Sequence, residues 1–119
     1  MTNAHAFFER RDRLNRAVLA QADRTTKRFL ALDHDAYAEG ALPARTKELL
    51  GLVASAVLRC NDCVTYHLVR AKEEGAKKEE LVEALSIALV VGGSIAIPHL
   101  REAFALLEEL YPSEPLALG

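Results

Sequence analysis

Cysteine is scarce in this chain, with only two in 119 residues. So few cysteines cannot build the disulfide-dense scaffold of many small secreted domains. Basic charge is not in excess either, because 15 lysines and arginines are set against 17 acidic residues, which gives a formal net charge of −2. A basic surface for nucleic acid or for an anionic membrane is therefore not expected.

Long apolar runs are also missing. The longest stretch without charge or histidine is residues 84–98, which is 15 residues, whereas a membrane span needs about 20. The first residues show no basic segment followed by an apolar run, so no signal peptide is expected. Since 50% of the residues are hydrophobic and 27% are charged, the composition predicts a single small domain over residues 1–119, soluble and cytoplasmic.

Apolar residues recur with a helical period almost throughout, and the alternation typical of strands is missing. The sequence therefore predicts an all-α fold with about six helices. Gly40 suits the end of the second helix, and Pro43 suits the first turn of the third, where its missing N–H costs nothing. The expected helices cover about residues 3–22, 27–39, 44–58, 60–75, 77–91 and 94–111, and residues 113–119 are expected to fray.

Two of the expected helices, residues 44–58 and 77–91, are apolar on nearly all sides. A chain of this size buries only about two-thirds of its surface, and extra apolar faces on a small domain usually contact another subunit. We therefore expect a homo-oligomer. The alternative is that the other helices of the same chain cover these faces.

Both cysteines lie in one short motif, Cys60-Asn61-Asp62-Cys63, and His67 follows it. On a helix that begins near Cys60, the two sulfurs and the imidazole share one face. The first turn of a helix lowers a thiol pKa, and His67 can take the proton of a cysteine one turn away. A peroxide oxidises such a thiol to a sulfenic acid, which condenses with the second thiol to form a disulfide. The motif thus favours a thiol-dependent peroxidase or disulfide oxidoreductase.

Two other interpretations of the motif stay open. Cys60, Cys63 and His67 supply three metal ligands, and zinc usually takes a fourth, for which His99 or Glu48 is available. Free cysteines can instead be small buried hydrophobes. Both alternatives predict a metal-stabilised or structural oligomer whose cysteines never cycle between thiol and disulfide.

From Gly40 to about Ile97 the sequence resembles the carboxymuconolactone decarboxylase superfamily, and within it the alkylhydroperoxidase D-like branch. The resemblance rests on the Cys-x-x-Cys-x-x-x-His motif and on three flanking segments. These segments are residues 40–49, residues 75–84 and the glycine pair 92–93. The resemblance makes residues 40–97 the motif-bearing core, whereas residues 1–39 form N-terminal helices that carry little of it.

The resemblance implies an all-helical fold around a helical hairpin, assembled into trimers or hexamers. It also implies a proton relay of one glutamate, two cysteines and one histidine. In the family pattern eleven residues separate the glutamate from the first cysteine, and here residues 49–59 separate Glu48 from Cys60. The implied roles are Cys63 as the attacking thiol, Cys60 as the resolving thiol, and His67 with Glu48 as the relay. The implied substrate is a small peroxide or disulfide, with a dithiol as electron donor and with neither cofactor nor metal.

Two physical considerations are at odds with those assignments. The helix dipole alone favours Cys60 as the reactive thiol, since it lies nearer the helix start, whereas proximity to the base favours Cys63. A simple antiparallel hairpin that turns near Arg59 also places Glu48 about one helical turn beyond His67. Direct contact between these two side chains would then need a later start of the second helix or a water-bridged path.

Asp62 departs from the better-known peroxidases of this branch, which have a histidine immediately before the second cysteine. A carboxylate beside a thiol raises the thiol pKa and works against peroxidase activity, although Asp62 is also a suitable helix-cap residue. A third activity, decarboxylation or ring-opening of a small lactone acid, would need a cationic pocket, and no cluster of arginine or lysine is evident beside the motif.

Overall fold

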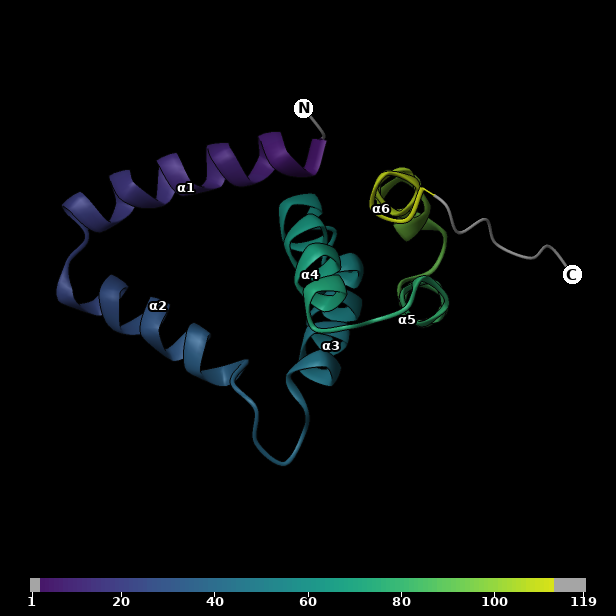
Figure 1. Ribbon diagram of the computed structural model, residues 1–119, viewed down its shortest axis with the longest axis horizontal. Helices are drawn as coiled ribbons and strands as arrows, with labels where there is room; N and C mark the ends of the chain where they lie inside the picture. Colours follow the sequence, from purple (N-terminus) through teal and green to yellow (C-terminus); the bar gives the residue numbers. More distant parts are fainter. Residues whose placement is uncertain (1–2, 113–119) are drawn as a thin grey trace, which may run out of the picture.

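The chain folds into helices throughout residues 3–112, the part that the computed structural model describes. The six α-helices and one short 3₁₀ helix confirm the predicted all-α fold, and no strand occurs in this part of the chain (Figure 1). In chain order they are α1 (Asn3–Gln21), α2 (Arg24–Ala36), α3 (Ala44–Val57), α4 (Asn61–Glu73), α5 (Lys78–Gly92), η1 (Ser94–Ala96) and α6 (Ile97–Leu110). The predicted fraying of residues 113–119 lies outside the described residues.

The predicted break after the first helix is present, but α2 begins earlier than expected, directly after Asp23. The Asp23 carboxylate accepts a hydrogen bond of 2.9 Å from the backbone N–H of Thr26. This bond, made to the ionised form, lowers the pKa of Asp23 below its usual value. Residues 24–26 are therefore the first turn of α2 and not part of the break.

The predicted end of the second helix at residue 39 is wrong, because α2 ends at Ala36. The Lys47 side chain donates hydrogen bonds to the carbonyls of Ala36 and Ala38, at 3.0 and 2.6 Å. A cation at the carboxyl end of a helix satisfies carbonyls that the helix leaves unpaired. Pro43 is the N-cap residue of α3 instead of lying within its first turn.

The turn between α3 and α4 is set by Arg59, whose φ of 63° is in the left-handed region. The N–H groups of Arg59 and Cys60 donate back to the carbonyls of Ala56 and Ser55, at 3.1 and 3.0 Å. This is the Schellman pattern that ends helices. The turn reverses the chain so that α4 packs along α3, which forms the predicted helical hairpin.

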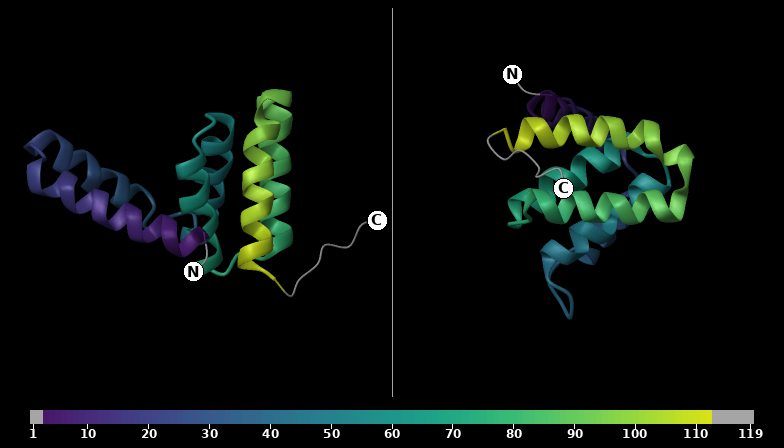
Figure 2. Two further views of the ribbon diagram at one scale, coloured as in Figure 1. Left: turned by 90° about the horizontal axis from the view of Figure 1, so that it is seen from above. Right: turned by 90° about the vertical axis from the view of Figure 1, so that its right-hand side faces the viewer.

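Helices α3 to α6 form the body of the molecule. Figure 2 shows α3 with α4 as one layer and α5 with α6 as a second layer beside it. The side chains buried most completely come from all four helices, and each such leucine contributes about 1.5–3 kcal/mol to stability. They are Leu52, Leu68, Leu81, Leu85 and Leu107.

Helices α1 and α2 form an arm that extends away from the body (Figure 1). At its amino end, α1 is attached to α6, because the backbone N–H groups of Asn3 and Ala4 each donate to the Glu109 carboxylate at 2.8 Å. Neither arm helix buries any residue completely, and Phe29 and Leu32 are 67% and 65% exposed. None of the described helices combines the length and apolar character needed to cross a membrane.

Candidate functional site

The two cysteines lie at the start of α4, as the sequence predicts. Cys60 is the N-cap residue, and its sulfur accepts a hydrogen bond of 3.2 Å from the backbone N–H of Cys63. The two residues are joined by a disulfide bond, with Cα atoms 5.3 Å apart. A helix start therefore holds both sulfurs where they can pair without refolding.

Glu48 and His67 form a buried pair next to the motif. Nδ1 of His67 lies 2.8 Å from Oε2 of Glu48, and the Glu48 side chain is 3% exposed. The expectation that Glu48 lies a turn beyond His67 is therefore wrong. The contact is direct, although α4 begins at Asn61, close to the expected start at residue 60.

Arg70, one turn beyond His67, lies on the other side of the Glu48 carboxylate. Its Nε is 3.9 Å from Glu48 Oε1. Its guanidinium also binds Glu73 and Glu74 at 2.8 and 3.0 Å. These carboxylates, Glu73 first, raise the pKa of Arg70 above its usual value, so a fixed positive charge accompanies the buried acid.

Tyr37 contacts His67 on the side away from Glu48, and the sequence pattern gives no signal for it beyond an apolar position on the second helix. Its hydroxyl oxygen lies 3.4 Å from Nε2 of His67. Burial, followed by the negative charges of Asp33 and Glu48, raises the pKa of Tyr37 above its usual value. The hydroxyl is therefore protonated at neutral pH.

Gly51 allows these groups to meet. A Cβ atom at this position would lie 2.7 Å from the Tyr37 hydroxyl oxygen and 2.8 Å from Cε1 of His67. Such distances are shorter than van der Waals contact permits. The signal in the sequence is a glycine within residues 49–58, a stretch in which every other residue is apolar or small.

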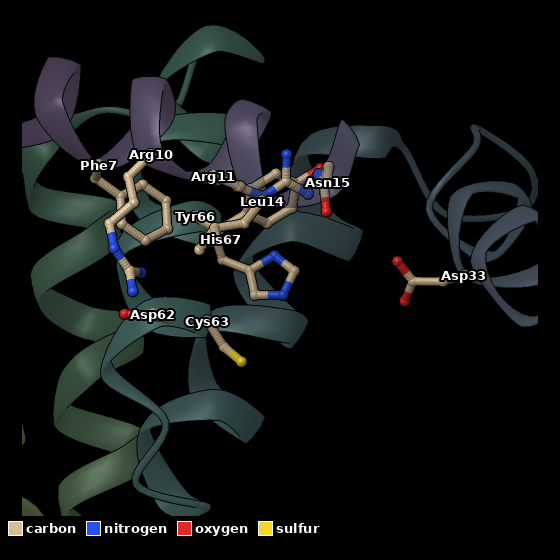
Figure 3. A pocket seen from close by; sticks show the side chains of 10 residues that line it. All are labelled: Phe7, Arg10, Arg11, Leu14, Asn15, Asp33, Asp62, Cys63, Tyr66 and His67. Atoms are coloured by element: carbon tan, nitrogen blue, oxygen red, sulfur yellow. The ribbon is translucent and has the colours of Figure 1, made fainter. Parts of the chain in front are cut away.

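A cavity of about 350 Å³ opens over Cys63 and His67, between α1 and α4 (Figure 3). It is lined by Phe7, Arg10, Arg11, Leu14, Asn15, Asp33, Asp62, Cys63, Tyr66 and His67. Cys63 is exposed, whereas Cys60 is only partly exposed and does not line the cavity. A molecule in this cavity can therefore reach Cys63 first.

The cavity corrects two expectations about charge. Arg10 and Arg11 of α1 supply the arginine cluster that was not evident beside the motif, because the fold brings α1 over α4. Asp62 is not the cap of α4, since that position is held by Cys60. Asp62 instead lines the cavity, as do both arginines.

Tyr66 follows the Cys-x-x-Cys motif on α4 and lies beside His67 in the chain. Its ring lines the cavity and contacts His67, with ring centroids 5.2 Å apart. The Arg11 guanidinium lies 4.3 Å from the Tyr66 ring centroid, which is a cation–π geometry. Tyr66 therefore connects α1 to the site.

The metal-binding interpretation finds no support in the described part of the chain. Within residues 3–112, no group of three or more His, Cys, Asp or Glu side chains is arranged to hold a metal ion. The fourth ligand considered, His99, has its Nδ1 2.7 Å from Oδ1 of Asn61. Glu48, the other candidate, is bonded to His67.

Fold and site together define an all-helical protein with a Cys-x-x-Cys pair at a helix start and a buried Glu–His pair whose histidine lines the same cavity as the second cysteine. The sequence profile of the carboxymuconolactone decarboxylase family matches residues 23–109. The chain belongs to this family.

Two curated relatives have no characterised activity. The chain is 37% identical over 82 residues to uncharacterized protein 4 in the cox locus of Paracoccus denitrificans, an alignment that covers 69% of this chain and 74% of the relative. It is 33% identical over 72 residues to an uncharacterized protein of Cupriavidus necator, covering 60% of this chain and 64% of the relative.

Solved structures extend the likeness to nearly the whole chain. A carboxymuconolactone decarboxylase family protein from Thermotoga maritima, for which a role in the antioxidative response has been suggested, is 58% identical. Its alignment covers 90% of this chain and 91% of the other, with a TM-score of 0.86. A family protein from Legionella pneumophila is 24% identical, with a TM-score of 0.80 over 89% of this chain and 95% of the other, and supports the fold alone.

Proposed function

We propose that the protein is a thiol-dependent peroxidase that cycles Cys60 and Cys63 between dithiol and disulfide. The observation that carries this proposal is the disulfide at the start of α4, whose Cys63 lines the same cavity as His67 of the hydrogen-bonded Glu48–His67 pair. The antioxidative role suggested for the Thermotoga maritima relative is in keeping with such a cycle. The reverse use of the same pair, reduction of a disulfide substrate, follows the same chemistry.

In the first step, the Cys63 thiol loses its proton to His67 and the thiolate attacks one oxygen of the peroxide. The O–O bond breaks, the leaving alkoxide takes up the proton from the imidazolium, and Cys63 becomes a sulfenic acid. In the second step, the Cys60 sulfur attacks the Cys63 sulfur, a disulfide forms and water leaves. A dithiol donor then returns two electrons and two protons to the pair.

Exposure favours Cys63 as the attacking thiol. Its side chain reaches the cavity, whereas Cys60 is held at the N-cap position with its sulfur bonded to the Cys63 N–H. Cys60 then acts as the resolving thiol. The dipole of α4 favours a thiolate at either position.

Glu48 supports the base in this mechanism. A carboxylate that accepts the Nδ1–H of a histidine fixes the tautomer and stabilises the imidazolium formed during proton transfer. Because Glu48 is buried and Arg70 lies beside it, the carboxylate remains oriented toward His67 throughout the cycle.

The cavity suits a small organic peroxide. Phe7, Leu14 and Tyr66 offer apolar contacts, and Arg10 and Arg11 stand at the α1 side. The arginines also suit a carboxylate substrate of the lactone-acid kind, which remains the second candidate. That activity would not need the cysteine pair.

We further propose that the protein works as a cytoplasmic homo-oligomer, a trimer or hexamer. Large apolar side chains are exposed on the arm, including Phe29 and Leu32, and on α5, including Val90 and Val91. No described helix of the same chain covers them. A second copy of the chain would remove this surface from water.

The test is peroxide consumption with dithiothreitol as electron donor and an organic hydroperoxide as substrate. We expect Cys63→Ser to lose about 100-fold or more of the rate, because the attacking sulfur is gone. We expect Cys60→Ser to lose turnover but still to form one sulfenic acid per chain, which a dimedone adduct reports by mass spectrometry. Full activity in both variants would overturn the proposal, and a cysteine-independent reaction with a lactone acid would favour the second candidate.

A further inference from the structure

Tyr37 and Glu48 contact opposite nitrogens of the same imidazole. The carboxylate of Glu48 faces Nδ1 of His67 at 2.8 Å, and the hydroxyl of Tyr37 faces Nε2 at 3.4 Å. An ionised carboxylate only accepts hydrogen bonds, and a neutral imidazole has one donor and one acceptor nitrogen. Nδ1 therefore carries the hydrogen, and Nε2 accepts the hydroxyl hydrogen of Tyr37.

The position of Tyr37 is held from two sides. Lys47 donates to the carbonyls of Ala36 and Ala38, the residues on either side of Tyr37, at 3.0 and 2.6 Å. On the other side, Gly51 leaves the space in which the hydroxyl and the imidazole meet. Two residues of α3 thus hold the tyrosine against His67, although Tyr37 belongs to the segment that follows the arm.

We propose that Tyr37 is a positioning residue of the redox centre, whose hydroxyl fixes the orientation of the His67 ring by donating to Nε2 while Glu48 holds Nδ1. Because Nε2 has a single lone pair, the hydroxyl hydrogen leaves this nitrogen before it takes up a proton. The inference rests on the proposed function for the role of His67 as a base. The contact itself is independent of any reaction. Tyr37 touches no reacting atom and acts through His67.

The raised pKa of Tyr37 keeps the hydroxyl in its donor form. Removing the hydroxyl leaves Nε2 without this donor, whereas Nδ1 keeps its contact with Glu48. The ¹⁵N signals of the two ring nitrogens report this difference.

Other charges around His67 remain in place when the hydroxyl is removed. These charged or titratable groups are Glu48 on α3, Asp62, Tyr66 and Arg70 on α4, Arg10 and Arg11 on α1, and Asp33 on α2. A change seen on removal of the Tyr37 hydroxyl alone is therefore attributable to that group.

The experiment is ¹⁵N NMR of the His67 ring in the disulfide form at one fixed pH, with Tyr37→Phe compared to the unmodified chain. We expect the Nε2 signal to shift in Tyr37→Phe, because this nitrogen loses a hydrogen-bond donor, whereas the Nδ1 signal changes less. We also expect the rate of peroxide consumption to fall several-fold, because the ring is less well oriented. The control is Tyr111→Phe, which removes a buried hydroxyl that donates to the Ala76 carbonyl at 2.8 Å, far from the site in sequence and in its contacts.

An Nε2 signal in Tyr37→Phe that matches the unmodified chain would overturn the inference, whatever the activity. If the Nε2 signal shifts but no form of the protein consumes peroxide, the inference stands and the proposed function fails. If Tyr37→Phe does not fold, Lys47→Met releases the same segment while leaving the hydroxyl in place. It should then shift the Nε2 signal as well, and an unchanged signal in that variant would overturn the inference.

Discussion

At the scale of single residues, the site depends on how closely the side chains of Tyr37 and His67 can approach α3 at Gly51. Cys60, Cys63 and His67 could be identified from the sequence because one helical period places all three on one face. Glu48 could be identified only through the family pattern, since helix geometry alone placed it too far from His67. Tyr37 could not be identified, because no local spacing relates the end of one helix to a residue 30 positions further along.

Gly51→Ala tests the close approach directly. Alanine favours the helix by about 1 kcal/mol relative to glycine, but its methyl group would force His67 and Tyr37 apart. We expect peroxide consumption to fall about 10-fold or more, with a change in thermal stability that remains small because the two effects oppose each other. The rate with dithiothreitol and the melting temperature are the two measurements.

The matched control is Gly92→Ala at the end of α5. There, a Cβ atom would meet Ala96 at 3.5 Å and Val57 at 3.8 Å, which is ordinary contact. We expect this variant to keep the rate of the unmodified chain. Equal rates in both alanine variants would contradict the role assigned to Gly51.

At the scale of helices, the sequence predicted their number and most of their positions, because the apolar period and the turn residues are local signals. The carboxyl end of α2 was misplaced because it is decided by Lys47, which lies on another helix. The start of α2 was misplaced because residues 24–26 look like part of a polar break, although Asp23 caps them. Tertiary contacts and capping thus account for the errors.

The cap at Asp23 gives the fold a pH dependence at the start of α2. The pKa of Asp23 is lowered in the folded chain from an ordinary value of 3.8. The cap therefore stabilises the fold fully above that ordinary value, and the contribution is lost as the pH falls through the lower, folded value.

Asp23→Ala should accordingly lower the melting temperature at neutral pH. The difference from the unmodified chain should shrink as the pH is lowered below about 4. Differential scanning calorimetry between pH 3 and pH 7 measures both effects. Asp12→Ala, a change inside α1 and not at a helix start, is the control, and an equal loss in both variants would contradict the capping role.

At the scale of the whole molecule, the packing of helices α3 to α6 gives no reason for the exposed apolar side chains of the arm formed by α1 and α2. The sequence predicted excess apolar surface from helices 44–58 and 77–91, and the structure places much of it on α5 and adds the arm. The N-terminal residues carried little family signal, so the position of α1 over the cavity could not be predicted. That position supplies Arg10 and Arg11 to the site.

The proposed assembly can be tested on the arm. Replacing Phe29 and Leu32 together by aspartate puts two charges on a face that a second copy would otherwise bury. We expect the mass measured by light scattering to fall toward that of one chain, 13.1 kDa. Thr25→Asp, an exposed change on the same helix, should leave the oligomer intact, and an unchanged mass in the double variant would exclude the arm as the contact.

The sulfur of Cys60 has two roles, one in capping α4 and one in the proposed redox cycle. The atom that accepts the Cys63 N–H and so begins α4 is also one of the two atoms that store the electrons of the proposed cycle. Reduction and reoxidation of the disulfide therefore change the strength of the hydrogen bond that caps α4. By thermodynamic linkage, any substitution that strengthens one redox state of this first turn shifts the midpoint potential as well as the folding equilibrium.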